Sequence, residues 1–108
     1  MNRSGDLLRH VVLFRLREEN TPEETQKVGA AFMAMRAQIE AIHDLEWGAD
    51  VSVEGKAQGF THCLLVTFTS EAGRDAYLPH PEHKAFGKVL GPVMDDVFVI
   101  DFWSHGGE

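Results

Sequence analysis

The first regular segment of the chain carries apolar side chains on both of its faces. From Leu7 to Arg17 the residues alternate with period two, as they do in a β-strand. One face presents Val12 and Phe14. The opposite face presents Val11 and Leu13. A strand of this kind has to be covered on both sides, which limits the chain to folds in which the sheet lies between two layers.

The rest of the pattern completes a βαββαβ order. It predicts a helix over Pro22–Ile42, strands over Leu45–Glu54 and Phe60–Thr69, short helices over residues 70–77 and 82–90, and a last strand over Val97–Trp103. Thr21 and Glu24 have the spacing of a capping box in front of the first helix. The order is typical of the ferredoxin-like α+β fold, a four-stranded antiparallel sheet with its helices on one face. Residues 7–103 then form one domain, between flexible ends at residues 1–6 and 104–108.

The second face of this predicted sheet has nothing within the chain to cover it. Leu13, Cys63 and Leu65 lie on that face, and two short helices can cover only the other one. A large exposed apolar face favours an interface. Two such sheets packed face to face would give a homodimer with two-fold symmetry, a dimeric α/β barrel. Arg9 and Arg15 share this face and must then reach its rim or an acidic partner.

Composition excludes several classes of partner and location. A chain of 108 residues suits a single domain. Its formal net charge of −7 disfavours nucleic acid and anionic membranes as partners. No apolar run approaches the roughly 20 residues of a membrane-spanning helix, and the N-terminal residues lack the pattern of a signal peptide. The single cysteine, Cys63, allows no intrachain disulfide and fits a cytoplasmic location.

Two of the six histidines interrupt apolar strand faces. His10 and His62 both lie on the side of their strands that faces the helices, and the fold makes these two strands neighbours. Their rings are therefore expected to lie close together. One interpretation is a pair of core histidines that hydrogen-bond to the backbone or to each other. The favoured one is that they line a pocket between sheet and helices, where imidazole can exchange protons near neutral pH.

A second concentration of histidine lies in the segment from Tyr77 to His83. His80 precedes Pro81, a pattern typical of a helix start, and His80 is expected to cap that helix. His83 falls in the first helical turn, where the helix dipole favours the neutral imidazole. Neutral imidazole beside a phenol can act as a general base and a hydrogen-bond donor. For Tyr77 and His83 this chemistry and simple packing are both open.

No metal or cofactor is expected. His80, Glu82 and His83 could reach one ion, but no second spaced pair supports a zinc site. The chain contains no nucleophile elbow, phosphate-binding loop or dinucleotide-binding glycine run. Cys63 is expected to be a small apolar side chain, since no cation is placed to activate its thiol.

Several motifs together resemble the stress-responsive dimeric A/B barrel family. They are HVVLFRL from His10, WG at Trp47, GFTH at residues 59–62, YLPHPEH at residues 77–83, Phe86, and DF at residues 101–102. The resemblance spans about Leu8 to Trp103 and implies the ferredoxin-like fold and a homodimer formed sheet to sheet.

The family includes a cofactor-free plant polyketide cyclase, and the chain is similar to it at four positions. The resemblance implies that His83 is the general base and that Tyr77 orients a substrate carbonyl. It also implies a ligand site lined by His10 and His62, together with Phe14 and Phe86.

The first helix departs from the cyclase, because Phe32, Met33 and Met35 occupy the region where the cyclase contributes a pocket tyrosine. The predicted function is therefore binding of a small hydrophobic or oxygenated molecule. The alternative is a cofactor-independent cyclase or lyase that transfers protons through the tyrosine–histidine pair. A third hypothesis, a heme- or quinol-handling monooxygenase of the wider barrel group, has no support in the motifs.

Overall fold

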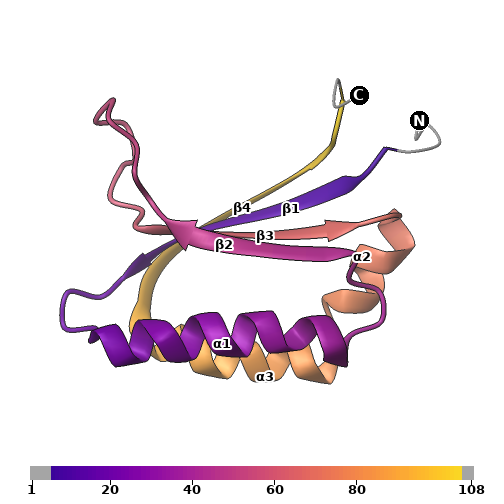
Figure 1. Ribbon diagram of the computed structural model, residues 1–108, viewed down its shortest axis with the longest axis horizontal. Helices are drawn as coiled ribbons and strands as arrows, with labels where there is room; N and C mark the ends of the chain where they lie inside the picture. Colours follow the sequence, from indigo (N-terminus) through magenta and orange to yellow (C-terminus); the bar gives the residue numbers. More distant parts are fainter. Residues whose placement is uncertain (1–5, 106–108) are drawn as a thin grey trace.

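The computed structural model describes residues 6–105 and shows a four-stranded antiparallel sheet with helices on one face (Figure 1). Its elements are β1 (Leu8–Leu16), α1 (Pro22–Gln38), β2 (Asp44–Ala49), β3 (His62–Phe68), α2 (Glu71–Tyr77), α3 (Pro81–Leu90), the short 3-10 helix η1 (Gly91–Val93) and β4 (Met94–Trp103). The expected ferredoxin-like fold is confirmed. Of the ends expected to be flexible, residues 1–5 and 106–108 lie outside the described residues.

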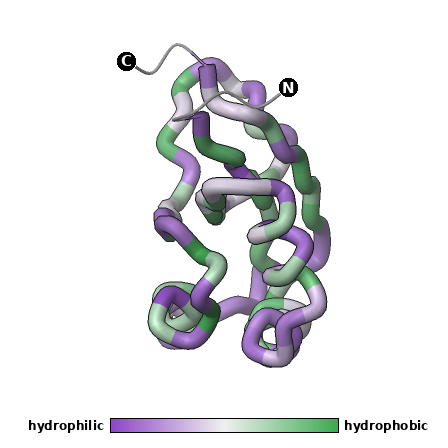
Figure 2. Tube along the Cα trace, turned by 90° about the vertical axis from the view of Figure 1, so that its right-hand side faces the viewer, coloured by the Kyte–Doolittle hydropathy of each residue, from purple (hydrophilic) through white to green (hydrophobic). Residues whose placement is uncertain are grey.

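The sheet order is β2-β3-β1-β4, so β1 and β3 are the central strands, as expected. Across the sheet, Phe14 lies opposite His62, and His10 lies opposite Val66 on one side and Asp101 on the other. Seen end on, α1 and α3 run side by side beneath the strands (Figure 2). The register therefore decides which side chains meet between the sheet and these helices.

The helix α1 begins at the predicted capping box. The backbone N–H of Glu24 donates to the Thr21 hydroxyl at 3.2 Å, and the N–H of Thr21 donates to the Glu24 carboxylate at 2.8 Å. The helix ends at Gln38 instead of the predicted Ile42, because Ile39 adopts an extended conformation. Ile39 and Ile42 are nevertheless buried. The helical spacing of apolar residues continues past Gln38 because buried positions attract apolar residues whether or not the segment is helical.

The strand β2 is shorter than predicted. It ends at Ala49, whose partner is His62, the first residue of β3. Beyond this pair the Asp50 N–H still donates to the Thr61 carbonyl, but the strand pairing does not continue. Residues 50–61, which we call the arm, leave the sheet as a long loop (Figure 1). Val51 and Val53 fall within the predicted strand Leu45–Glu54 but lie outside β2, and they are 88% and 95% exposed. The predicted start of the next strand at Phe60 was also wrong, because β3 begins to pair only at His62.

The core lies between the sheet and the helices. Fully buried aromatic rings include Phe14, Phe32 and Phe68. Gly29 in α1 is also buried, and a Cβ built on it would lie 2.0 Å from the ring of Trp47 in β2. Only glycine lets the helix approach the indole this closely, so this contact sets the spacing between α1 and the edge of the sheet.

The other face of the sheet, which we call the open face, is not covered by the described part of the chain. It carries Val11, Leu13, Cys63, Leu65, Phe98, Ile100 and Phe102. The β4 residues Phe98 and Ile100 are each 52% exposed. Arg15 lies at one end of this face and donates to the carboxylate of Asp95 at 2.6 Å. Arg9, at the other end, instead donates to the Thr67 hydroxyl at 2.8 Å.

Candidate functional site

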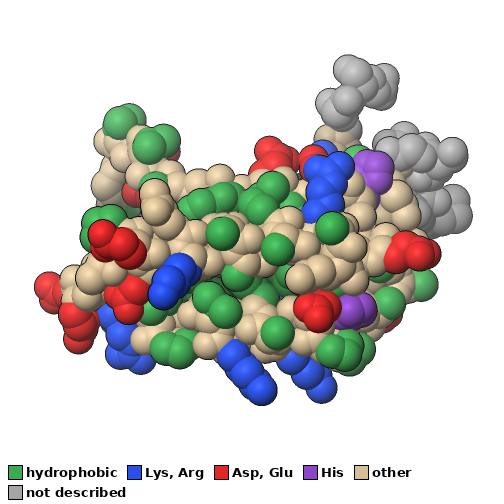
Figure 3. Space-filling model, turned by 60° about the horizontal axis from the view of Figure 1, so that its bottom comes forward, with side chains coloured by type: hydrophobic (Ala, Val, Ile, Leu, Met, Phe, Trp, Pro, Cys, Tyr) green, Lys and Arg blue, Asp and Glu red, His purple; other side chains and the backbone are tan. Residues whose placement is uncertain are grey.

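Figure 3 shows histidine side chains as separate patches at the end of the molecule where α2 lies. Three of the residues singled out in the sequence are in contact with one another near the start of β1. The ring of His10 meets that of Tyr77 edge-on with centroids 5.9 Å apart. The rings of Tyr77 and His83 are closer, at 4.2 Å. The structure thus brings together residues from β1, α2 and α3, which we call the His–Tyr cluster: His10, Tyr77 and His83.

His10 is held in one orientation by a carboxylate. Its Nδ1 lies 2.7 Å from Oδ1 of Asp101, which stands directly opposite on β4. An ionised carboxylate only accepts hydrogen bonds, so Nδ1 of His10 is the donor. The ring is buried, with 6% of the residue exposed. In the neutral ring the acceptor lone pair is therefore on Nε2.

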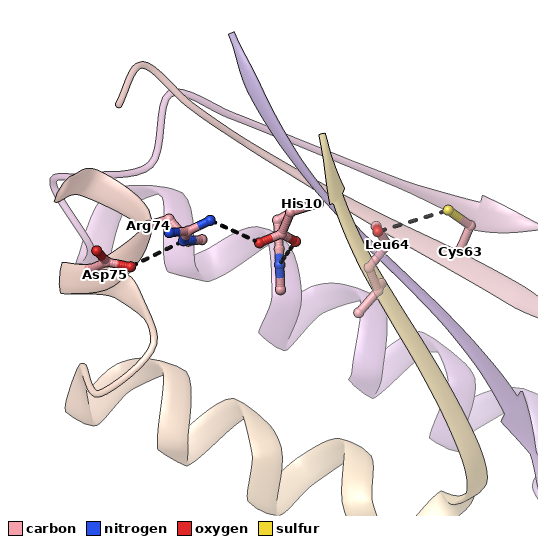
Figure 4. A network of polar contacts seen from close by, with 6 residues as sticks. His10, Cys63, Leu64, Arg74 and Asp75 are labelled. Carbon is pink, nitrogen blue, oxygen red and sulfur yellow. Dashed lines mark hydrogen bonds and ion pairs between the residues drawn. The ribbon is translucent and has the colours of Figure 1, made fainter. Parts of the chain in front are cut away.

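Asp101 is itself held by α2. Nη1 of Arg74 donates to its Oδ2 at 3.3 Å, and Nε of Arg74 donates to Asp75 at 3.1 Å (Figure 4). The charges therefore alternate from Asp75 through Arg74 to Asp101, whose other carboxylate oxygen accepts from His10. Each of these carboxylates accepts a hydrogen bond from a cation or an N–H donor.

Tyr77, the last residue of α2, is the most enclosed member of the cluster. It is 2% exposed, and its ring lies 5.2 Å from that of Phe68. Burial raises the pKa of the Tyr77 phenol well above its usual value. The hydroxyl therefore remains protonated at neutral pH and is available as a hydrogen-bond donor.

His83 lies in the first turn of α3 and is partly exposed. Its Nδ1 is 2.9 Å from the carbonyl oxygen of Leu78. A carbonyl only accepts, so Nδ1 carries the proton and the neutral ring keeps its lone pair on Nε2. His80 is used differently. The backbone N–H of Glu82 donates to its Nδ1 at 3.0 Å, which confirms His80 as the cap of α3.

His62 lies away from the cluster, so the expectation that its ring neighbours His10 was wrong. Antiparallel register pairs His10 with Val66, four residues and roughly 13 Å along the strand from His62. The His62 ring stacks on Phe14 at 5.4 Å and on Trp47 at 6.2 Å. Burial lowers the pKa of His62, which favours its neutral form.

The two phenylalanines expected at a ligand site belong to different neighbourhoods. Phe14 is fully buried beside His62. Phe86 lies in α3 and packs on Phe32 of α1, with ring centroids 5.6 Å apart. The structure therefore places the His–Tyr cluster and the pair of Phe14 and His62 at opposite ends of the central strands, whereas Phe86 packs on Phe32 between α1 and α3.

Asp101 and Arg74 were missed as site residues at the sequence level. Asp101 did carry a signal, because it is the only charged residue in the otherwise apolar segment Val97–Trp103. In antiparallel pairing it had to oppose a residue of β1, and that residue is His10. No comparable signal marked Arg74, whose contact depends on how α2 returns to the end of the sheet.

Groups of side chains that could bind a metal ion, and the Cys63 thiol, were the other candidates for chemistry. Within residues 6–105, no group of three or more histidine, cysteine or acidic side chains is placed to hold a metal ion. Burial raises the pKa of the Cys63 thiol, which leaves it a weak nucleophile. Among the helices of the same residues, none has both the length and the apolar character needed to cross a membrane.

Comparison with known proteins places the chain in a family. The model of the stress responsive A/B barrel domain, Dabb, matches residues 8–104. The chain belongs to the Dabb family. It is 32% identical over 95 residues to the stress-response A/B barrel domain-containing protein HS1 of Arabidopsis thaliana, covering 88% of this chain and 87% of HS1. It is 27% identical over 95 residues to olivetolic acid cyclase of Cannabis sativa, covering 88% of this chain and 94% of the cyclase.

Two solved structures show the same fold. An Arabidopsis thaliana crystal structure superposes with a TM-score of 0.88 at 30% identity, covering 94% of this chain and 98% of that one. A dimeric ferredoxin-like protein from Thermobifida fusca superposes with a TM-score of 0.77 at 25% identity, covering 94% of each chain.

Proposed function

We propose that this Dabb protein binds a small, largely apolar, oxygenated molecule at the His–Tyr cluster and transfers protons to and from it without a cofactor. The observation that carries the proposal is the contact of Tyr77 with His83 at 4.2 Å. One partner of this contact is a phenol kept protonated by burial, and the other is an imidazole whose free nitrogen is set by a backbone carbonyl. Proton transfer at the carbon next to a carbonyl group needs a hydrogen-bond donor for the carbonyl oxygen and a base for the proton, and this contact provides both.

The proposed roles follow from the hydrogen bonds. The Tyr77 hydroxyl donates to a carbonyl oxygen of the ligand. Nε2 of His83 takes a proton from the adjacent carbon, and the electron pair of the broken C–H bond moves into an enolate whose oxygen Tyr77 stabilises. The enolate then either takes the proton back or attacks a second carbonyl, as in an aldol-type cyclisation. His10, oriented by Asp101, supplies a second site for proton exchange.

The apolar rings on the helix side suit the rest of such a ligand. Phe14, Phe86 and His62 are proposed to contact its hydrocarbon part. The likeness to olivetolic acid cyclase supports carbonyl chemistry as the reaction class. Phe32 and Met35 of α1 are completely buried, so the interior beneath this helix is apolar. A ligand with few charged groups is therefore favoured.

Hydrogen–deuterium exchange at carbon tests this function directly. Acetophenone in deuterated buffer loses its methyl proton signal slowly by itself, and NMR follows this loss with and without protein. We expect the protein to accelerate the exchange. Tyr77→Phe and His83→Ala should each reduce the acceleration by about a hundredfold or more, the usual contribution of a general acid or base. His43→Ala changes an exposed histidine outside the cluster and serves as the control.

The possible outcomes separate catalysis from binding. Accelerated exchange that persists in both variants would contradict the assigned roles. A thermal shift with acetophenone but no acceleration would show a binding protein without turnover. Absence of both effects across a panel of aryl ketones would remove the proposal for this class of ligand.

We further propose that two copies pair through the open face. This face exposes Phe98, Ile100 and Phe102, each at least half exposed, over a sheet that the chain itself leaves uncovered. The similarity to a dimeric ferredoxin-like protein supports the same assembly. The lone cysteine, Cys63, lies on this face. We also propose a cytoplasmic location, which a single unpaired cysteine fits.

A further inference from the structure

We infer that the arm, residues 50–61, is a clasp that closes on the second copy of the chain and seats Val51 and Val53 against it. The inference rests on the proposed dimer and adds a second contact surface to it. It concerns the segment in which the predicted strand pattern and the observed structure differ most.

The arm has a defined shape. The N–H of Asp50 donates to the carbonyl of Thr61 at 2.8 Å, which closes its base. The Asp50 carboxylate accepts from the N–H of Ser52 at 3.0 Å, and the N–H of Phe60 donates to the carbonyl of Ala57 at 3.1 Å. Gly59 turns the chain back towards the sheet with φ of +87°, a conformation that favours glycine. These bonds hold the arm in one direction.

That direction is away from the helices. In Figure 1 the arm rises from one end of the sheet on the side opposite α1 and α3, which is the side of the open face. Its base is part of that face, since the Phe60 ring stacks on Phe98 with centroids 6.2 Å apart. A hollow of about 450 Å³ between arm and sheet is lined by Leu13, Phe60 and Phe98, among others. A molecule that covers the open face must therefore also meet the arm.

The half of the arm that leaves β2 carries two apolar side chains that are unusually exposed. Val51 and Val53 are 88% and 95% exposed, the highest fractions among the large apolar side chains of residues 6–105. Figure 3 shows hydrophobic side chains at the end of the arm. Antiparallel neighbours are commonly joined by two to five residues, so a segment of this length is not needed to connect β2 to β3. The extra length and the two valines require another explanation.

A second copy of the chain supplies that explanation. Two sheets packed face to face lie about 10 Å apart. An element that rises from the packed face then extends across this gap and along the partner. Two-fold symmetry makes the contact occur twice, so the dimer would cover four valines that the monomer leaves in water. The apolar area gained adds to the area of the open face without changing the monomer.

The double variant Val51→Ser/Val53→Ser tests the clasp by sedimentation equilibrium. Both side chains are almost fully exposed, so the monomer should keep its fold and circular dichroism spectrum. The Kd of the dimer should rise at least about tenfold because four apolar side chains lose their cover. The matched control is Met33→Ser/Val89→Ser, which removes two exposed apolar side chains of the helix layer, 40% and 37% exposed. This control should leave the Kd unchanged.

Amide hydrogen exchange gives a second measurement on the unaltered protein. Exchange of the amides of residues 51–58 should slow when the concentration is raised from below to above the Kd. An unchanged Kd in the double variant, or equally fast exchange in monomer and dimer, overturns the clasp while leaving a dimer through the open face intact. A protein that stays monomeric at every concentration instead overturns the proposed dimer, and the clasp with it.

Discussion

At the scale of single residues, His62 links burial to pH. Its ring stacks between Phe14 and Trp47, and burial lowers its pKa. The unfolded chain therefore binds a proton at a higher pH than the folded protein does. The contribution of His62 to the free energy of unfolding is therefore fully present above the ordinary histidine pKa of about 6.5, and it decreases as the pH falls below that value.

Replacement of His62 by phenylalanine should reduce this pH dependence. His62→Phe keeps a ring between Phe14 and Trp47 but removes the titrating group. Urea unfolding at fixed protein concentration, at pH 7.5 and again near pH 5.5, would give the free energies of unfolding (both values chosen about one unit from the histidine pKa). The parent should lose more stability between the two than His62→Phe does. An equal loss in both proteins would show that His62 titrates alike in the folded and unfolded chain.

The residues of the candidate site could be predicted to the extent that strand faces determine them. His10, Tyr77 and His83 were singled out from their positions in the sequence, and the structure brings their side chains together. The separation of His62 from His10 could not be predicted from their shared face, because alternation fixes a face but gives no register. Asp101 needed that same register before its position opposite His10 became visible.

At the scale of elements, the contact between α1 and β2 depends on a residue without a side chain. Gly29→Ala would place a methyl group 2.0 Å from the Trp47 ring. Alanine gains up to about 1 kcal/mol over glycine in a helix, whereas crowding of this kind costs about 1–3 kcal/mol. The crowding should prevail, and Gly29→Ala should lower the free energy of unfolding by about 1 kcal/mol in urea denaturation.

Gly87 in α3 provides the matched control. A Cβ at that position meets no atom within 4 Å, so Gly87→Ala keeps only the gain in helix propensity. It should raise the free energy of unfolding by about 0.5–1 kcal/mol. If both variants stabilise the protein, Trp47 moves aside at little cost and the contact does not set the helix position.

The order and type of elements followed from the sequence, while their ends did not. The capping box marked the start of α1 because it is a local signal formed by Thr21 and Glu24. The end of β2 is a non-local event, since it depends on where β3 begins to pair. Val51 and Val53 continue the alternation beyond Ala49, but alternation requires a neighbouring strand to become a sheet.

At the scale of the whole molecule, the two faces of the sheet differ sharply. Its helix side forms a packed core, but its open face leaves half or more of Phe98, Ile100 and Phe102 in water. Charged residues stand at the ends of this face, where Arg15 pairs with Asp95. An apolar centre with a charged rim is the arrangement typical of an interface between proteins.

Leu13 lies near the centre of this face and allows the sharpest test of the dimer. It pairs with Cys63 on β3 and with Phe98 on β4. In Leu13→Glu the dimer would have to bury two carboxylates in an apolar interface, while in the monomer the partly exposed position leaves the charge in water, beside a hollow that Lys56 also lines. The Kd of the dimer should rise by at least about a hundredfold.

Light scattering and sedimentation would show monomers, and Cys63, the only cysteine of the chain, should react faster with a thiol reagent. Met33→Glu places the same charge on the helix layer and should remain dimeric. If Leu13→Glu also remains dimeric and Cys63 reacts with the thiol reagent as fast in the parent as in the variant, the two copies do not meet through this face, because a dimer that covered the face would protect the thiol in the parent.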